Sequence, residues 1–356
     1  MNAQKWMFSL MVMTILVLAV YRPMAASVPR PPRSSQALSP QISPAFPEAG
    51  RILGSVRLPV IVDRDALLAF DSIWLIDGTT TGTLTRWDLV TRQTLATIQV
   101  GDPFLTPYGD PVAAVATRLA VWVTSVATHE LVRIDPASNQ ISGRISLGQV
   151  DGKDFTTYTM VGNDQVLFAW DYNRNLTLRI DLTTRQVGPA IPQVRPERVA
   201  DGALWAWDAV HPDLARNLLR IDLTGKKVLA RIPLDRVDPN EPLLANSLWF
   251  TAGAYVYRVD PAADQMVARI DVGATAYHVT NTGNVIWVTI SPDPAACRDL
   301  NQGAVLRIDP GTNSIVGETS LDCPSEMLSY DKNLWVMNND SELNGQNGSW
   351  FSILQP

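Results

Sequence analysis

The chain has 356 residues, of which 46% are hydrophobic and 18% are charged, and its net charge at pH 7 is −6. This length suffices for one large domain with a buried core. Residues 1–48 hold four of the 29 basic residues and one of the 35 acidic residues, so the remainder carries −9. Since phosphate backbones are bound by clustered Lys and Arg, we expect no nucleic-acid partner.

Residues 1–26 have the pattern of a signal peptide or an N-terminal anchor. Lys5 precedes a stretch without charge from Trp6 to Tyr21, which is about the length of a signal-peptide core. Small residues from Ala25 to Ser27 offer a cleavage site, and an uncleaved anchor that tethers the chain to a membrane is the alternative. Either outcome predicts an extracytoplasmic protein: secreted, periplasmic or at the cell surface.

Residues 27–50 are predicted to form a linker. The segment from Arg22 to Pro47 contains seven Pro with Ser and Gln between them. Such a composition cannot bury a core and is typical of an extended chain.

From residue 51 to the end of the chain, one short motif recurs. Its copies combine an apolar residue, Arg, an apolar residue and Asp, and each copy follows an apolar run that contains an aromatic residue. The Arg-containing copies are Thr85–Asp88, Val132–Asp135, Leu178–Asp181, Leu219–Asp222, Tyr257–Asp260 and Leu306–Asp309. The aromatic runs are centred on Trp74, Trp122, Phe168, Trp205, Trp249, Trp287 and Trp335.

This period of roughly 40 to 50 residues predicts an all-β, seven-bladed β-propeller of four-stranded blades. In the sixth unit the strands A and B are expected near Ala276–Thr280 and Val285–Thr289, with strand C at the Arg motif. The seventh unit ends with Ser349–Leu354 as its strand C. We expect Arg51–Leu58 to supply the missing outer strand, because an open ring would leave exposed edges.

The repeated Asp and Arg residues are expected to be structural. An Asp side chain accepts backbone N–H groups two residues later, and Pro136, Pro261 and Pro310 fix the next turn position. An Arg at one place in each blade is expected to pair with a neighbouring blade.

The two cysteines, Cys297 and Cys323, both belong to the sixth unit, in loops that open on the same face. We expect them to form a disulfide, which fits an oxidising compartment.

Propeller ligands usually lie over the central funnel, on the face built from the B-to-C loops and the loops between blades. The extra length of this chain falls in such loops, at Asp208–Arg216, Ser291–Gly303 and Asn338–Gly348. The last is oxygen-rich but matches a calcium loop only loosely, and no metal is expected. The candidate ligand-binding residues on this face are His129, His211, His278, Tyr277, Trp207 and Asp208. His278 is also the one weak candidate for catalysis.

The Leu306–Asn313 unit and the Leu-Trp strands resemble YVTN-type repeat propellers and, more distantly, the streptogramin (virginiamycin B) lyases. The resemblance implies the propeller fold and, for a lyase, two His segments and a Glu that assist C–O elimination with magnesium. Tyr277–Thr280 is similar to one such His segment. The matching segment Leu243–Asn246 has no His, and Ile290 stands in the place of the Glu.

We therefore expect an exported, non-enzymatic, monomeric propeller that binds a protein, peptide or glycan through its funnel face. The alternative is a streptogramin-lyase-like enzyme with a degenerate site around His278. Asp222–Lys227 resembles the docking repeat of quinone-dependent dehydrogenases, but Val228 and Leu229 stand where that repeat has a Trp. No cofactor is expected.

Overall fold

The computed structural model of the chain describes residues 46–60, 62–77, 82–101, 113–208, 215–240, 242–291, 303–340 and 348–356. Contacts divide the chain into two units, Met1–Pro44 and Ala45–Pro356, and the described residues all belong to the second. The predicted signal segment and nearly all of the predicted linker lie outside the described residues. Within the described residues, no helix is long and apolar enough to cross a bilayer.

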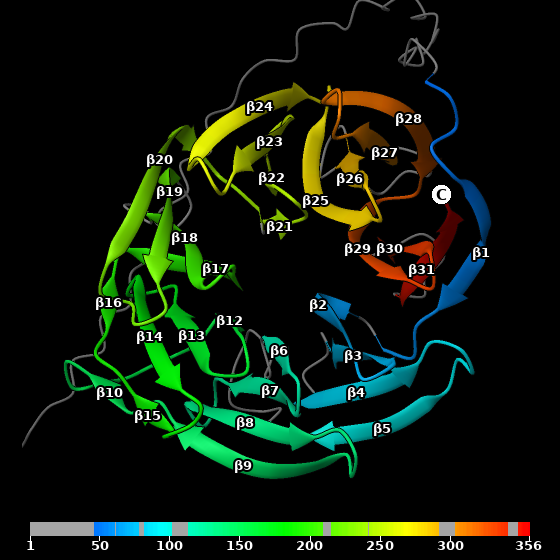
Figure 1. The fold of residues 1–356 in the computed structure, drawn as a ribbon. Helices are drawn as coiled ribbons and strands as arrows, with labels where there is room; N and C mark the ends of the chain where they lie inside the picture. The colour runs from blue at the N-terminus through cyan, green and yellow to red at the C-terminus, as the bar shows by residue number, and fades with distance from the viewer. Residues whose placement is uncertain are drawn as a thin grey trace, which may run out of the picture. The chain divides into compact units, whose positions relative to one another are not determined.

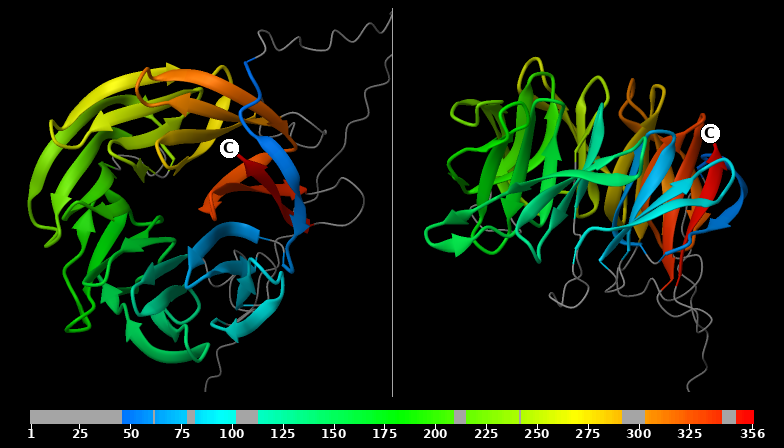
Figure 2. Two further views of the ribbon diagram at one scale, coloured as in Figure 1. Left: turned by 45° about the vertical axis from the view of Figure 1, so that its right-hand side comes forward. Right: turned by 90° about the horizontal axis from the view of Figure 1, so that it is seen from below.

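Seven antiparallel sheets surround a central opening, as the predicted seven-bladed β-propeller requires (Figures 1 and 2). The first blade comprises β2 (Val62–Ala69), β3 (Ser72–Asp77), β4 (Thr83–Asp88) and β5 (Thr94–Gln99). The second comprises β6 (Ala114–Thr117), β7 (Ala120–Ser125), β8 (Glu130–Asp135) and β9 (Gln140–Ser146). The third comprises β12 (Thr159–Gly162), β13 (Val166–Asp171), β14 (Leu176–Asp181) and an outer strand in two pieces, β15 (Gln186–Val187) and β16 (Ile191–Pro192).

The remaining blades repeat this order from the centre outward. The fourth comprises β17 (Val194–Ala200), β18 (Ala203–Asp208), β19 (Ala215–Asp222) and β20 (Val228–Val237). The fifth comprises β21 (Leu243–Leu244), β22 (Leu248–Ala252), β23 (Tyr255–Asp260) and β24 (Gln265–Asp271). The sixth comprises β25 (Thr275–Thr282), β26 (Val285–Ser291), β27 (Gly303–Asp309) and β28 (Ser314–Leu321). A separate hairpin, β10 (Gln149–Val150) and β11 (Lys153–Asp154), follows the second blade.

The seventh blade is closed by the N-terminal strand, as predicted. Its sheet has the order β1 (Arg51–Arg57), β31 (Gly348–Gln355), β30 (Asn333–Asp340) and β29 (Pro324–Tyr330). The antiparallel register runs from Arg51 opposite Gln355 to Arg57 opposite Trp350. The blue strand β1 lies beside the red strand β31 in Figure 1.

Residues 47–50, which the sequence assigned to the linker, pack against the sixth blade. The N–H of Glu318 in β28 donates to the carbonyl of Pro47, and the N–H of Ala49 donates back to Glu318. The N–H of Gly50 donates to the hydroxyl of Thr319 at 3.2 Å. The segment before β1 therefore ties the sixth blade to the seventh.

The hydrophobic pattern of each strand follows its depth in the blade. The second strands, such as β7 and β18, are buried at every position, because their two faces pack against the two neighbouring blades. The outer strands, such as β9, alternate exposed and partly buried residues instead. This gradient explains why the aromatic runs are continuous whereas the outer strands alternate.

The core is divided among the interfaces between blades. In the described residues, seven apolar clusters each join two neighbouring blades. The cluster between the seventh and the first blade contains Val56 and Leu58 together with Trp87 and Phe351. The N-terminal strand therefore contributes to the core as well as to the sheet.

The repeated Asp residues form turns, as predicted. The side chain of Asp135 accepts the N–H of Ala137 at 2.9 Å, and Asp88, Asp181, Asp260 and Asp309 accept the N–H two residues later in the same way. Asp222 accepts the hydroxyl of Thr224 and the N–H groups of Lys226 and Lys227.

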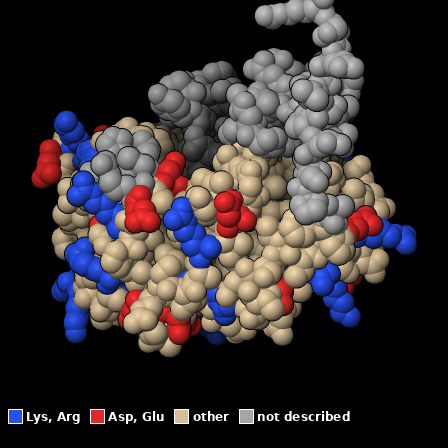
Figure 3. All heavy atoms as spheres, turned by 90° about the horizontal axis from the view of Figure 1, so that it is seen from above, with Lys and Arg blue, Asp and Glu red and all other residues tan. Residues whose placement is uncertain are grey.

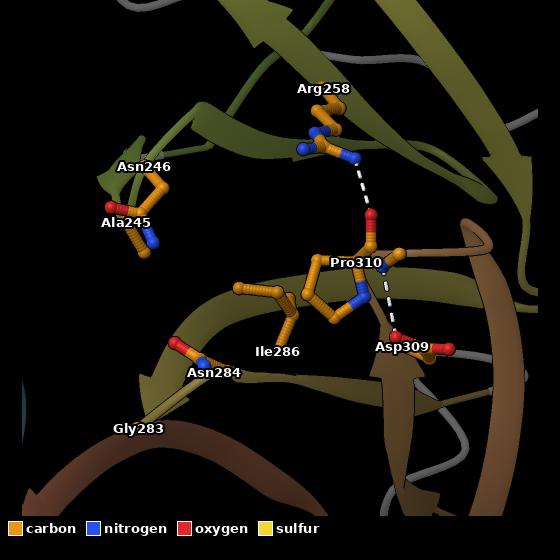
Figure 4. Close-up of a pocket in the computed structure, with 9 residues that line it drawn as sticks. Ala245, Asn246, Arg258, Gly283, Asn284, Ile286, Asp309 and Pro310 are labelled. Carbon is orange, nitrogen blue, oxygen red and sulfur yellow. Dashed lines mark hydrogen bonds between the residues drawn. The ribbon is translucent and has the colours of Figure 1, made fainter.

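The repeated Arg residues mostly connect neighbouring blades. Arg258 donates to the carbonyl of Pro310 at 2.5 Å, in the turn of the next blade (Figure 4). It also donates to Oδ1 of Asn313 in the same turn, at 2.9 Å. Contacts to the following blade are also made by Arg86, Arg179 and Arg220. The prediction is wrong for Arg133, whose hydrogen bonds to Ser142 and Leu119 stay within its own blade.

Replacing Arg258 by Met is expected to destabilise the propeller by about 2 kcal/mol, because hydrogen bonds from a charged group to the next blade are lost. The guanidinium also lies 5.0 Å from the ring of Trp249, a contact that Met cannot reproduce. Arg133→Met is the matched control, with an expected loss under about 0.5 kcal/mol, since its contacts are exposed. Urea unfolding measures both, and equal losses would contradict the role of Arg258.

Candidate functional site

The inner strands of the ring enclose a cavity of about 720 Å³. All seven blades contribute residues to its wall, so it is the central channel of the propeller. Because every blade repeats the same strand order around one axis, the inner strands run in the same direction. The hairpins from the second to the third strand therefore lie at the end of the channel where the inner strands begin, which is the predicted funnel face.

Charged side chains gather in the wall formed by the fourth to seventh blades. Among the described side chains that line the cavity, the ionisable ones are Arg195, Glu197, Arg198, Asp238, His278 and Glu326. The first three blades contribute mainly aliphatic residues there, including Leu67, Val115 and Val161. Arg195 and Glu326 lie in the first halves of their inner strands, and so towards the predicted funnel face. Glu197 and His278 lie near the middle of theirs, and Arg198 lies in the second half of β17.

Irregularities in the inner strands place several of these side chains. In β17 the register shifts between Pro196 and Arg198, around Glu197. In β25 it shifts between Ala276 and Val279, around His278. In β29 it shifts around Glu326, between Pro324 and Met327. A β-bulge changes the direction of a side chain, and bulges are frequent beside functional sites.

Two arginine side chains of the fourth blade form hydrogen bonds with the segment that leads into the fifth blade. Nε of Arg195 lies 2.6 Å from Oε1 of Glu197, and both side chains are mostly buried. Arg195 also donates to the carbonyl of Pro239 at 2.7 Å, and Arg198 donates to that of Pro242 at 3.2 Å. Since proline has no N–H to donate, Pro239 and Pro242 leave the inner strand of the fifth blade only two residues long.

His278 is held by its backbone. Its N–H donates to Oγ1 of Thr289 at 3.1 Å, and that hydroxyl donates to the carbonyl of Ser325 in the seventh blade at 2.7 Å. The imidazole lines the channel, but its Nδ1 is buried and has no hydrogen-bond partner among the described residues. Burial, and secondly the positive charge of Arg198, lower the pKa of His278 to about 4. The imidazole is therefore neutral at pH 7.

The structure brings together few of the residues that the sequence singled out. Of the six candidate ligand-binding residues, His278 is the one that lines the channel; His211 lies outside the described residues. His129 lies in the hairpin between β7 and β8 and does not line the cavity; its Nδ1 lies 3.2 Å from the carbonyl of Phe155 and its Nε2 lies 3.9 Å from Asp154.

Three other candidates do not line the cavity but contact neighbouring residues of the protein: Trp207, Asp208 and Tyr277. Trp207 is fully buried and its ring lies edge-on to Phe250 at 4.9 Å. Asp208 is buried and accepts the N–H of Asn217 at 2.7 Å, which fixes the start of β19. The carbonyl of Tyr277 accepts a hydrogen bond from Thr251 at 3.0 Å.

Other predicted features fall partly or wholly outside the described residues. Cys297 is outside them, and Cys323 is buried between β28 and β29, so their disulfide remains a prediction. Most of the three long insertions is also outside. Within the described residues, no cluster of three or more His, Cys, Asp or Glu could hold a metal ion.

The charged residues in the wall of the channel, other than His278, were not predicted from the sequence. The available signal was the occurrence of charge inside innermost strands, as in Val194–Ala200 and Pro324–Tyr330. Charged residues are seldom buried unless they are paired, so charge within an innermost strand needs an explanation. Bulges have no clear signature in one sequence, so the convergence of these side chains was not predictable.

Comparisons with known proteins support the fold. No protein-family description matches the chain, and no curated protein matches its sequence. Among solved structures, a streptogramin B lyase is similar with a TM-score of 0.59 and 15% identity, over 83% of this chain and 96% of the lyase. The chain therefore distantly resembles the virginiamycin B lyase-like propellers, as predicted.

Two further structures are similar. Hydrazine synthase from Kuenenia stuttgartiensis has a TM-score of 0.50 and 13% identity, over 64% of this chain and 73% of that protein. The computationally designed Ika8 protein has a TM-score of 0.52 and 9% identity, over 83% of this chain and all of its own. The neighbours include enzymes and a designed protein, so the likeness concerns the fold alone.

Proposed function

We propose that the chain is an exported, non-enzymatic β-propeller that binds a protein, peptide or glycan at the funnel face. The observation that carries this proposal is the gathering of charged side chains from four blades in the wall of a cavity of about 720 Å³. Concave sites with a few convergent polar groups are the usual form of ligand sites. The long loops that the sequence predicts on the same face would add contacts around the mouth.

The compartment and the assembly state are parts of the same proposal. Residues 1–26 would direct export or anchor the chain, and a disulfide between Cys297 and Cys323 would then fix part of the funnel face. On the side that Figure 3 shows, basic and acidic side chains are interspersed rather than gathered by sign. This distribution supports a partner other than nucleic acid, and a monomer is part of the same proposal.

A lyase-like enzyme centred on His278 is the second candidate, and the similarity to the streptogramin B lyase favours it. Among the described residues, however, no carboxylate or second imidazole hydrogen-bonds to His278, and a pKa of about 4 makes it a weak base. Wild type and His278→Ala should be incubated with cyclic and linear peptide esters. We expect no product with either protein, whereas turnover that the substitution abolishes would favour the lyase.

Peptide and glycan arrays test the binding proposal. We expect saturable binding by wild type and at least a tenfold loss with Asp238→Lys, because this exposed residue is one of the charged residues that line the cavity. Asp235→Lys is the matched control, since Asp235 is 89% exposed on the outer strand β20. Binding that both substitutions weaken equally, or that neither weakens, would place the partner elsewhere.

A further inference from the structure

Three aromatic side chains lie together in the third blade, on the side of the predicted funnel face. Trp170 is near the end of β13, Tyr172 follows in the hairpin to β14, and Tyr158 precedes β12 (Figure 1). The ring centroid of Tyr172 lies 5.6 Å from that of Trp170 and 6.2 Å from that of Tyr158. Trp170 lines the channel and is buried, whereas Tyr172 is 39% exposed. This aromatic cluster therefore extends from the wall of the channel to the surface.

The repeat does not require an aromatic residue at the position of Trp170, two residues after the repeated aromatic of β13. The second, fifth and sixth blades have a threonine there: Thr124, Thr251 and Thr289. Trp207 occupies this position in the fourth blade, but it packs edge-on against Phe250 and does not line the cavity. Nε1 of Trp170 donates to Oδ1 of Asn175 at 3.4 Å, within its own hairpin. Packing between blades therefore does not account for an aromatic residue beside the channel.

The exposure of Tyr172 differs in its place from that of the other large apolar side chains. Among the described residues, the others that are exposed lie in the segment before β1, in outer strands or in turns at the opposite end of the blades: Phe46, Ile52, Leu53, Val90, Leu95, Leu119, Val228, Leu229 and Val267. Tyr172 is the one in a hairpin of the predicted funnel face. An aromatic ring that remains exposed beside a cavity is available to a ligand.

Hydrogen-bonding groups lie next to the exposed ring. Nδ2 of Asn173 donates to the hydroxyl of Tyr158 at 2.8 Å, and Asn173 is exposed. In the part of the chain that the structure describes, Oδ1 of Asn173 accepts no hydrogen bond and the hydroxyl of Tyr158 donates none. The pair therefore offers one acceptor and one donor to a ligand.

The hairpin that carries Tyr172 and Asn173 is held in place. Nε of Arg174 lies 2.8 Å from Oδ2 of Asp171, and its other nitrogens donate to the carbonyls of Val150 at 2.9 Å and Asp154 at 3.2 Å. The guanidinium also lies 5.5 Å from the ring of Phe155. These contacts fix the hairpin to the segment between the second and third blades and neutralise its charge. A preorganised site loses less entropy when a ligand binds.

The angles between the rings distinguish a sugar from a proline-rich peptide. Proline-rich peptides dock in grooves lined by aromatic side chains. Here the rings of Trp170 and Tyr172 meet at 82° and those of Tyr158 and Tyr172 at 68°, so the edge of one ring fills the space beside the other. A sugar needs no such groove, because the C–H groups on one side of a pyranose pack on a single exposed aromatic face.

We propose that the aromatic cluster binds a neutral sugar ring, with its C–H groups on the ring of Tyr172 and two neighbouring hydroxyls on Asn173 and Tyr158. The inference rests on the proposed binding function and selects a glycan among its partners. One sugar hydroxyl donates to Oδ1 of Asn173, and the next accepts from the hydroxyl of Tyr158. Because Trp170 lines the channel, further sugar units would extend from the cluster towards the cavity.

Ligand-observed NMR tests the inference directly. The protein is titrated with cellotetraose, chitotetraose, mannotetraose and galactotetraose, and with acetylated hexaproline amide as the peptide probe. We expect saturable binding of at least one tetrasaccharide with a Kd below about 1 mM and none of hexaproline. Magnetisation should pass from protein to sugar most strongly at C–H protons of one ring face, and these signals should move upfield because they lie over an aromatic ring. Saturable binding of hexaproline alone, or of no probe, would overturn the sugar site.

Tyr172→Ala is expected to weaken sugar binding at least about tenfold, whereas Tyr172→Trp, which keeps an exposed ring, should keep both the affinity within about threefold and the upfield shift. Tyr255→Ala is the matched control, since Tyr255 begins β23 of the fifth blade and does not line the cavity. Asn173→Ala should cost about fivefold through the lost hydrogen bond, and it carries the test if Tyr172→Ala does not fold. Sugar binding that survives Tyr172→Ala, or that Tyr255→Ala weakens equally, would contradict the assignment.

The two proposals can fail separately. A peptide or glycan found on the arrays, with binding that Asp238→Lys abolishes and Tyr172→Ala leaves unchanged, would retain the binding function at the cavity and reject the sugar site. Sugar binding that Tyr172→Ala abolishes and Asp238→Lys leaves unchanged would retain the sugar site and reject the charged residues of the cavity as the place where the partner binds.

Discussion

A chain that begins at residue 59 is expected to melt roughly 10 °C below a chain that begins at residue 46. The shorter chain lacks β1, which pairs with β31 over Arg51 to Arg57, and the buried side chains of Val56 and Leu58. Their burial and the lost hydrogen bonds together amount to about 5 kcal/mol. The truncation also exposes the edge of β31, and an unpaired strand edge favours aggregation. Thermal unfolding followed by circular dichroism measures the difference.

Substitutions within β1 separate the loss of the strand from the loss of chain length. Val56→Asp places a charge in the cluster between the seventh and first blades, whereas Ile52→Asp changes a residue that is 46% exposed in the same strand. We expect about 3 kcal/mol of destabilisation from the first and under about 1 kcal/mol from the second. A peptide of residues 46–60 should restore the melting temperature of the shorter chain. Melting of both chains within 2 °C would show that the ring does not depend on this strand.

Acidification from pH 7 to pH 4 is expected to cost wild type about 3 kcal/mol of unfolding free energy through His278 alone. In the unfolded chain this imidazole takes up a proton near its usual pKa of 6.5, whereas in the folded protein its pKa is about 4. Between these values the unfolded state binds more protons, so stability falls as the pH falls. Above pH 6.5 both states are neutral and the contribution disappears.

His278→Asn should remove this part of the acid sensitivity. Urea unfolding at pH 7, 5.5 and 4 is expected to give a shallower decline for the variant, and His129→Asn, in the hairpin between β7 and β8, is the matched control. The turn carboxylates Asp88, Asp135, Asp181 and Asp222 have lowered pKa values, chiefly through hydrogen bonds from neighbouring residues. Their contribution begins to decline as the pH approaches the usual value of 3.8 and is lost as the pH falls through the lowered values, equally in wild type and in the variant. If the free energies of unfolding of wild type and of His278→Asn declined in parallel as the pH falls, the lowered pKa of His278 in the folded protein would be refuted.

The repeat predicted the blades because repeated positions have repeated surroundings. The Trp of each second strand is in the part of the blade that two neighbours cover, and the Asp after each third strand forms a local turn with the next few residues. Both features depend on a short stretch of chain, and the period of the sequence records them. The closing strand was also predictable, because Arg51–Leu58 matches the pattern of Gln140–Leu147 and the last unit lacked one strand.

Among the described residues that line the cavity, His278 is the one that the sequence had singled out as a candidate site residue. The loop histidines were chosen because loops commonly carry function, but His129 does not line the cavity and instead contacts the segment around Asp154. Charge also occurs in the inner strand of the first unit, as Asp63, Arg64 and Asp65, but the inner strands of the second and third units have none, so it does not follow the period of the repeat. Predictions based on the repeated positions therefore left out the charged residues that depart from the repeat.

The sequence by itself determined the ring of seven blades, the strand that closes it and the turns, because these depend on local hydrogen bonding and on apolar patterns repeated along the chain. Only the tertiary structure decided which side chains meet in the channel. Arg198 and His278 are 80 positions apart in sequence, and a bulge, a strand shortened by two prolines and the curvature of the ring together bring them to one cavity. Each of these three depends on how blades pack against one another, and no single segment of the chain encodes that packing.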